Sequence, residues 1–186
     1  MASPSILINR APVLTLWASV VAEHLGYDPE AALSLGKAVA GLTAQSKGRR
    51  LGVFKSPREI SGARAPKRGL GEEFWIELCG RAIPAKHTAA GVRAVVKDKP
   101  IEAEGVARYL AEKFGDGLAP ARAAMRVLAR SLPADELAGA AFGLYEQFRP
   151  AIPAGTRGWG AKGQLDLERL RALARKPTRG PRPRES

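Results

Sequence analysis

The chain has 186 residues, 45% of them hydrophobic and 26% charged, and its 30 lysines and arginines against 18 acids give a net charge of +12. This length suits one domain or two small ones. One cysteine and two histidines exclude an internal disulfide framework and a structural zinc site built from Cys and His.

The first predicted element is a helix from about Pro12 to Leu25, which Gly26 ends. Apolar side chains recur at helical spacing and predict one buried face, made of Val13, Trp17, Val20, Val21 and Leu25. Arg10 and the uncharged run 11–22 also resemble a signal peptide. Because the helical periodicity is the stronger signal, we expect a core helix and a cytoplasmic protein.

A second helix is predicted from Asp28-Pro29-Glu30, a typical N-terminal cap, to about Ser46. Its polar positions form one narrow stripe, so most of the helix should be buried. The stripe is Glu30, Ser34, Lys37, Gly41 and Gln45. The two helices suggest a helix-turn-helix, but an acid and alanines open the second one and cannot read bases. A core hairpin is therefore expected.

Residues 46–70 are rich in Pro, Ser, Gly and basic side chains, which predicts a basic loop or linker. The β-prone runs 74–79 and 92–96 follow, separated by a segment containing Pro, Thr and Gly. They predict a small hairpin, with one helical turn as the alternative for the first run.

Helical patterns return at Glu102 and continue to the end of the predicted domain. The expected helices run from 102 to Gly115, over 121–130 with Met125 and Leu128 inward, and from Pro133 to Pro150. The third should bury Leu137, Ala141, Leu144, Tyr145 and Phe148. A Gly-rich loop at 155–163 precedes a last short helix whose leucines are Leu165, Leu167, Leu170 and Leu173.

Residues 176–186 offer no apolar side chain other than proline rings to bury, so a disordered basic tail is predicted. The fold class that follows is mainly α: a compact helical domain over residues 1–175, with one small β-hairpin as an option. No apolar run reaches the roughly 18 residues of a membrane span.

The positive charge is segregated. Residues 45–69 carry a net +7 and residues 169–186 a net +6, so the other 143 residues sum to −1. This pattern is typical of arms that neutralise phosphates. It predicts non-catalytic, largely sequence-independent binding of DNA or RNA. The candidate phosphate contacts are Lys47, Arg49, Arg50, Lys67, Arg68, Arg175, Lys176 and Arg179.

The segment Gly158–Gly163 matches the letters of a dinucleotide-binding fingerprint, but no strand is predicted before it and the chain ends 23 residues later. Arg157 and Lys162 would instead bind a phosphate, and Trp159 would stack on a base. The interpretation that the sequence favours for Trp159 is structural, with its ring packed on the core while the glycines turn the chain.

Two other functions stay open: an adaptor that docks acidic protein partners, and an enzyme acting on a phosphorylated small substrate at the 155–163 loop. A membrane surface is disfavoured because the basic segments lack large apolar anchors. No catalytic residue, metal or cofactor is predicted, and the oligomeric state is left open. His24 is expected to pack or cap, His87 to lie in a polar loop, and Cys79 to be a small buried residue. The acidic clusters around Glu73 and Glu104 are expected to be solvated.

Overall fold

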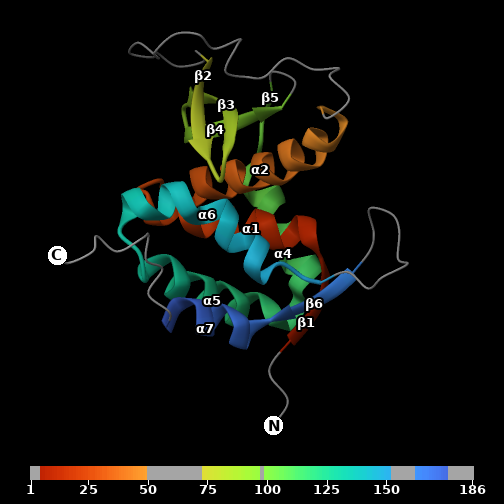
Figure 1. Ribbon diagram of the computed structural model, residues 1–186. Coiled ribbons are helices and arrows are strands. Elements are labelled where there is room, and N and C mark those ends of the chain that lie inside the picture. The colour runs from red at the N-terminus through yellow and green to blue at the C-terminus, as the bar shows by residue number, and fades with distance from the viewer. Residues whose placement is uncertain (1–4, 50–72, 97–98, 152–161, 176–186) are drawn as a thin grey trace, which may run out of the picture.

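The computed structural model describes residues 5–49, 73–96, 99–151 and 162–175, and for residues 45–49 it describes the backbone alone. Most of these residues are helical and two small antiparallel sheets complete them, which confirms a mainly helical fold with some β-structure (Figure 1). The helices are α1 (Arg10–His24), α2 (Pro29–Arg49), α4 (Ala103–Phe114), the short 3₁₀ helix η1 (Gly115–Gly117), α5 (Leu118–Arg130), α6 (Ala134–Phe148) and α7 (Leu167–Arg175). The strands are β1 (Ser5–Asn9), β2 (Glu73–Leu78), β3 (Arg81–Thr88), β4 (Gly91–Val96), β5 (Lys99–Pro100) and β6 (Lys162–Asp166).

Helix α1 is the centre of the molecule, with α2 on one side and α5 on the other (Figure 1). Every residue from Pro12 to Ala22 is buried. The prediction of a single apolar face on this helix was therefore wrong, and Leu25, assigned to that face, is only partly buried. The reason is that Ala, Ser and Thr lie between the large apolar residues, and side chains this small let neighbouring helices pack all round α1.

The turn between α1 and α2 follows the predicted signals. The Tyr27 amide donates to Ala22 O and the Gly26 amide to Glu23 O, while Gly26 has a φ of +112°. This is a Schellman motif, and it requires the left-handed conformation that glycine adopts at low cost. Helix α2 then begins at Pro29, as predicted, and the pair is a core hairpin.

The sheet beside α2 has four strands in the order β2-β3-β4-β5, so the prediction of a single hairpin was too small. The segment predicted as a connection is strand β3, which pairs with both β2 and β4. Its Pro84 argued against a strand because proline lacks the N–H donor of the sheet ladder. Pro84 stands opposite Trp75 in the β2–β3 pairing, and the β3–β4 pairing, which runs only from Ala85 to Thr88, does not include it.

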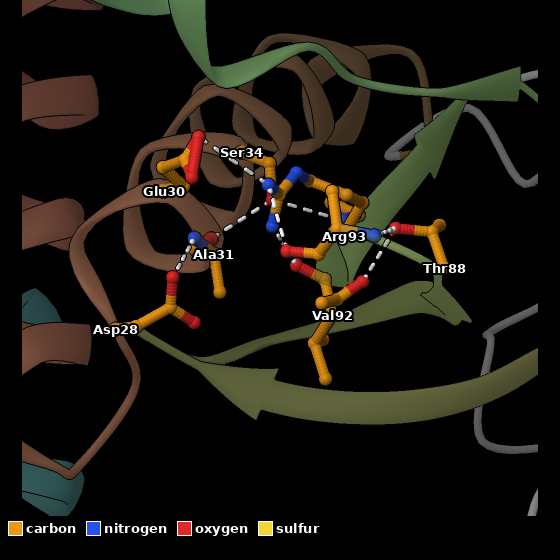
Figure 2. A network of polar contacts seen from close by, with 10 residues as sticks. Asp28, Glu30, Ala31, Ser34, Thr88, Val92 and Arg93 are labelled. Carbon is orange, nitrogen blue, oxygen red and sulfur yellow. Dashed lines mark hydrogen bonds and ion pairs between the residues drawn. The ribbon is translucent and has the colours of Figure 1, made fainter.

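A polar network fixes this sheet on α2 (Figure 2). The Ser34 hydroxyl donates to Ala31 O at 2.8 Å and accepts from the Ala94 amide of β4 at 3.0 Å. Arg93 is buried, donates to Val92 O at 2.8 Å, and lies 3.6 Å from a Glu30 carboxylate oxygen at the start of α2. The sequence placed Ser34 in the polar stripe expected to face solvent, which was wrong. The side chain is fully buried, and its hydroxyl accepts a hydrogen bond from the Ala94 amide of β4.

Replacing Ser34 with alanine is expected to destabilise the fold by about 1–3 kcal/mol, because the buried Ala94 amide loses its acceptor. Ser19 provides the matched control, since it is also a buried helical serine and its hydroxyl donates only to Leu16 O. Ser19→Ala should change stability little, because it leaves no buried hydrogen-bond donor without an acceptor. The midpoints of urea unfolding compare the two variants, and equal losses would contradict the role given to Ser34.

The remaining helices agree with the predicted order. Helix α4 ends at Phe114 before Gly115, and α6 begins after Pro133. Helix α5 begins at Leu118 rather than at residue 121. The predicted inward residues are all buried: Met125, Leu128, Leu137, Ala141, Leu144, Tyr145 and Phe148.

A second sheet, not predicted, joins the two ends of the described chain. Strand β1 pairs antiparallel with β6, with Ser5 opposite Asp166 and Asn9 opposite Lys162. Leu165 and Gly163 therefore lie in a strand, and not in the last helix or the Gly-rich loop as predicted. Helix α7 begins at Leu167, where Asp166 Oδ1 accepts from the Glu168 amide at 2.9 Å.

Among the described residues, no helix is both long and apolar enough to cross a membrane.

Candidate nucleic-acid interface

Four of the predicted contact residues lie in the described part of the chain. Lys47 and Arg49 belong to the last turns of α2, Lys162 begins β6, and Arg175 ends α7. Lys162 and Arg175 are exposed. The others lie outside the described residues, namely Arg50, Lys67, Arg68, Arg157, Trp159, Lys176 and Arg179. The predicted loop 46–70 begins as helix, since α2 continues to Arg49.

The structure does not bring these four residues to one place. The end of α2 lies on the side of the β2–β5 sheet, where Arg81 Nε donates to Thr43 Oγ1 at 3.2 Å. Helix α7 packs on α5 at the opposite end of the molecule, with α1 between (Figure 1). Lys162 starts the β6–α7 segment and Arg175 ends it. A cationic surface around Arg175 therefore needs basic residues other than the predicted ones.

Helix α5 supplies such residues, which were not predicted from the sequence. Arg122, Arg126 and Arg130 recur every fourth residue, so they form one stripe along the helix at a spacing of about 6 Å. Arg126 and Arg130 are exposed and Arg122 is half-buried. Their spacing was visible in the predicted helix 121–130. Net charge summed over long segments hides this stripe, because the acidic residues of α6 offset the arginines of α5.

Helix α7 lies beside α5 in the same direction and adds its own arginines. The two helix ends, Arg130 and Arg175, line one hollow of about 550 Å³. Arg171 lines it as well, together with the apolar side chains of Val127 and Ala174. We call this site the α5–α7 hollow; its lining is completed by Ser131. Val127 is 51% exposed, as is Val96 on β4.

Few carboxylates oppose these cations. Helix α5 contains no acid and α7 contains one, Glu168, which forms an ion pair with Arg171. Glu23 of α1 lies 3.7 Å from Arg126. Within the described residues, neither Arg130 nor Arg175 forms an ion pair.

A smaller hollow of about 280 Å³ continues along α5 and shares Arg130 with the first. Glu23, His24 and Arg126 contribute to its lining. His24 Nε2 lies 3.2 Å from Leu132 O, so this histidine packs against the end of α5, as predicted. Arg126 and Arg130 of the stripe therefore line this hollow, and Arg130 lines both.

The region before the Gly-rich segment holds a second pair of cations. Arg149 caps the end of α6, and Arg10 Nε donates to Pro150 O at 2.9 Å. Burial, and secondarily the charge of Arg149, lower the pKa of Arg10. Residues 152–161 lie outside the described residues, so the phosphate contact of Arg157 and the base stacking of Trp159 stay predictions.

The predicted environment of His87 was wrong, whereas that of Cys79 is confirmed. His87 lies in β3 and stacks on Phe74 of β2 with ring centroids 4.7 Å apart, so it belongs to a strand and not to a polar loop. Cys79 is buried, and burial raises the pKa of its thiol to about 12. Such a thiol stays protonated near neutral pH and is a poor nucleophile.

The acidic clusters behave as solvated faces: Glu73, Glu77, Glu102 and Glu104 are all exposed. Within the described ranges, no three His, Cys, Asp or Glu side chains gather in a way that could hold a metal ion. The chain matches no protein-family model, no curated protein and no solved structure.

Proposed function

We propose that this chain binds nucleic acid without catalysing a reaction, and largely without sequence preference. The observation that carries the proposal is the arginine stripe of α5 beside Arg171 and Arg175 of α7. Guanidinium groups in a row neutralise successive phosphates, and their planar fork suits phosphate oxygens. The basic residues 50–69 and 176–186 lie outside the described residues, and their part in binding is proposed from their charge alone. The cytoplasm stays the predicted location.

The proposal predicts electrostatic affinity that depends on α5. Replacing Arg122, Arg126 and Arg130 together with glutamine should weaken binding to all duplex sequences alike. The slope of log affinity against log salt should become shallower by up to about 2.7, since each phosphate contact contributes about 0.9. Fluorescence anisotropy of a labelled duplex across a salt series measures both effects.

A matched control removes the same charge elsewhere. Lys86 on β3, Lys99 on β5 and Arg108 on α4 lie outside α5 and α7. Their triple glutamine variant should keep a salt slope close to that of the wild type. If both triple variants lose equal affinity, net charge alone drives binding and α5 has no special part. If the wild type binds neither DNA nor RNA at low salt, the proposed function is wrong.

An adaptor for acidic proteins is the second candidate, and the exposed Val127 between cationic neighbours is the observation that favours it. An acidic peptide with one leucine would pair carboxylates with Arg130 and Arg175 and cover Val127. Titrating such a peptide under the same conditions separates the candidates. Binding of the peptide without binding of nucleic acid would make the adaptor the better assignment.

A further inference from the structure

Two arginines lie close together where α1 begins and α6 ends. Arg10 is the first residue of α1, and Arg149 directly follows α6. Both are half-buried, and the charge of Arg149 adds to burial in lowering the pKa of Arg10. Within the described residues, neither of them forms an ion pair. Like charges this close and partly removed from water repel each other, and an anion between them would relieve that repulsion.

Structural roles account for only part of this arrangement. Arg10 Nε donates to Pro150 O at 2.9 Å, which uses one of its several donors. The Arg149 side chain forms no hydrogen bond to any residue that the structure describes. The end of α6 contributes about half a negative charge, and the start of α1, with no acid in its first turn, about half a positive one. These partial charges offset each other and leave two full cations unneutralised.

The hydroxyl of Tyr145 is a third donor at the same place. The residue is 3% exposed, and among the described residues its hydroxyl has one partner, Arg10 O at 3.5 Å. That distance is long, since an O–H···O bond usually spans about 2.7–2.8 Å. Burial raises the pKa of Tyr145 to about 12, so it stays a donor near neutral pH, and the charges of Arg149 and Arg10 act on the same hydroxyl. A buried donor with so weak an acceptor favours a ligand that supplies a better one.

The chemistry of these three groups identifies the ligand. Guanidinium groups bind oxyanions through paired N–H donors, and a tetrahedral phosphate has enough oxygens to accept from both arginines and from the hydroxyl at once. Glu146 is the carboxylate that acts on Tyr145, and its effect is weaker than that of either arginine. It is exposed and forms no ion pair with the described residues, so the excess of positive charge remains.

We propose that Arg10, Arg149 and the hydroxyl of Tyr145 bind a phosphate group. The site lies at the start of α1, whereas His24, at the other end of this helix, lies beside the arginine stripe of α5. The inference therefore goes beyond the proposed function, because it adds a separate phosphate site and does not require nucleic acid. The phosphate belongs either to a polynucleotide or to a separate ion, and the experiment distinguishes these two sources.

Thermal unfolding of the whole chain in rising inorganic phosphate, with chloride keeping the ionic strength constant, tests the site. Phosphate at a hundredfold excess over its Kd should raise the Tm of the wild type by about 5–10 °C. Tyr145→Phe keeps the ring and should weaken phosphate binding about tenfold. Arg149→Gln should weaken it at least as much. Without phosphate, Arg149→Gln should leave the Tm unchanged or raise it, because it removes a repelling charge, whereas a structural role of this side chain would lower it.

Two residues of α4 provide matched controls. Tyr109 is half-buried and its ring contacts Lys37, a contact that Tyr109→Phe keeps. Arg108 is exposed beside Glu104. Tyr109→Phe and Arg108→Gln should respond to phosphate as the wild type does, and the general stabilisation by phosphate salts is common to all variants. A wild type that responds no more to phosphate than to chloride would overturn the inference.

A response to phosphate that survives both Tyr145→Phe and Arg149→Gln would overturn it as well. A labelled duplex without terminal phosphates then identifies the source. If Arg149→Gln also weakens duplex binding, the site takes a backbone phosphate; if duplex binding is unchanged, it takes a separate phosphate ion. Both results require the response of the wild type to phosphate. Failure of the chain to bind any nucleic acid would remove the proposed function and leave this response, and the site, standing.

Discussion

Replacing Trp17 with alanine is expected to lower the free energy of unfolding by about 3–5 kcal/mol, the range for deleting a large core side chain. Trp17 has no exposed surface and lies in the middle of α1. Its indole Nε1 donates to Ala141 O at 2.8 Å, and its ring meets Phe148 edge to face at 5.2 Å. The substitution thus removes a buried volume, an aromatic contact and the partner of a buried carbonyl.

Chemical denaturation measures this loss, and Val96→Ala serves as the control because that side chain is half in solvent. The control should change stability by less than about 0.5 kcal/mol. If Trp17→Ala kept its stability and lost a ligand instead, the face of α1 that carries Trp17 would be a binding surface. That outcome would favour the adaptor over the nucleic-acid binder.

Two glycines of α2 should respond to alanine in opposite directions. A Cβ atom at Gly36 would overlap the carbonyl oxygen of Thr15 and approach the Ser19 amide nitrogen to 3.0 Å, so α1 and α2 would have to separate. Gly36→Ala should therefore cost about 1–3 kcal/mol, as overpacking of a core does. A Cβ atom at Gly41 would meet nothing within 4 Å, and Gly41→Ala should gain up to about 1 kcal/mol from helix propensity.

Both glycine variants change the same residue type in the same helix, so their comparison isolates the contact between α1 and α2. Midpoints and slopes of guanidinium unfolding measure the difference, and an unchanged slope indicates that stability alone has altered. Stabilisation by both substitutions would mean that the two helices do not approach as closely as the structure has them.

Signals between residues close in sequence predicted much of the helical framework. Gly26 and the Asp28-Pro29 pair marked the turn between α1 and α2, and Gly115 marked the end of α4. The apolar spacing around Trp17 placed that residue in the core. These features depend on backbone conformation and side-chain periodicity within a few turns, which the sequence carries directly.

Contacts between distant segments decided the rest. Strand β1 exists because it pairs with β6, at the other end of the described chain, and Ser34 is buried because a strand amide from β4 needs its hydroxyl. The arginine stripe of α5 could have been read from its spacing, but its meeting with Arg175 could not. Only the packing of α7 on α5 brings Arg130 together with Arg171 and Arg175. The spacing of residues determines which face a helix presents, and the tertiary structure determines what that face meets.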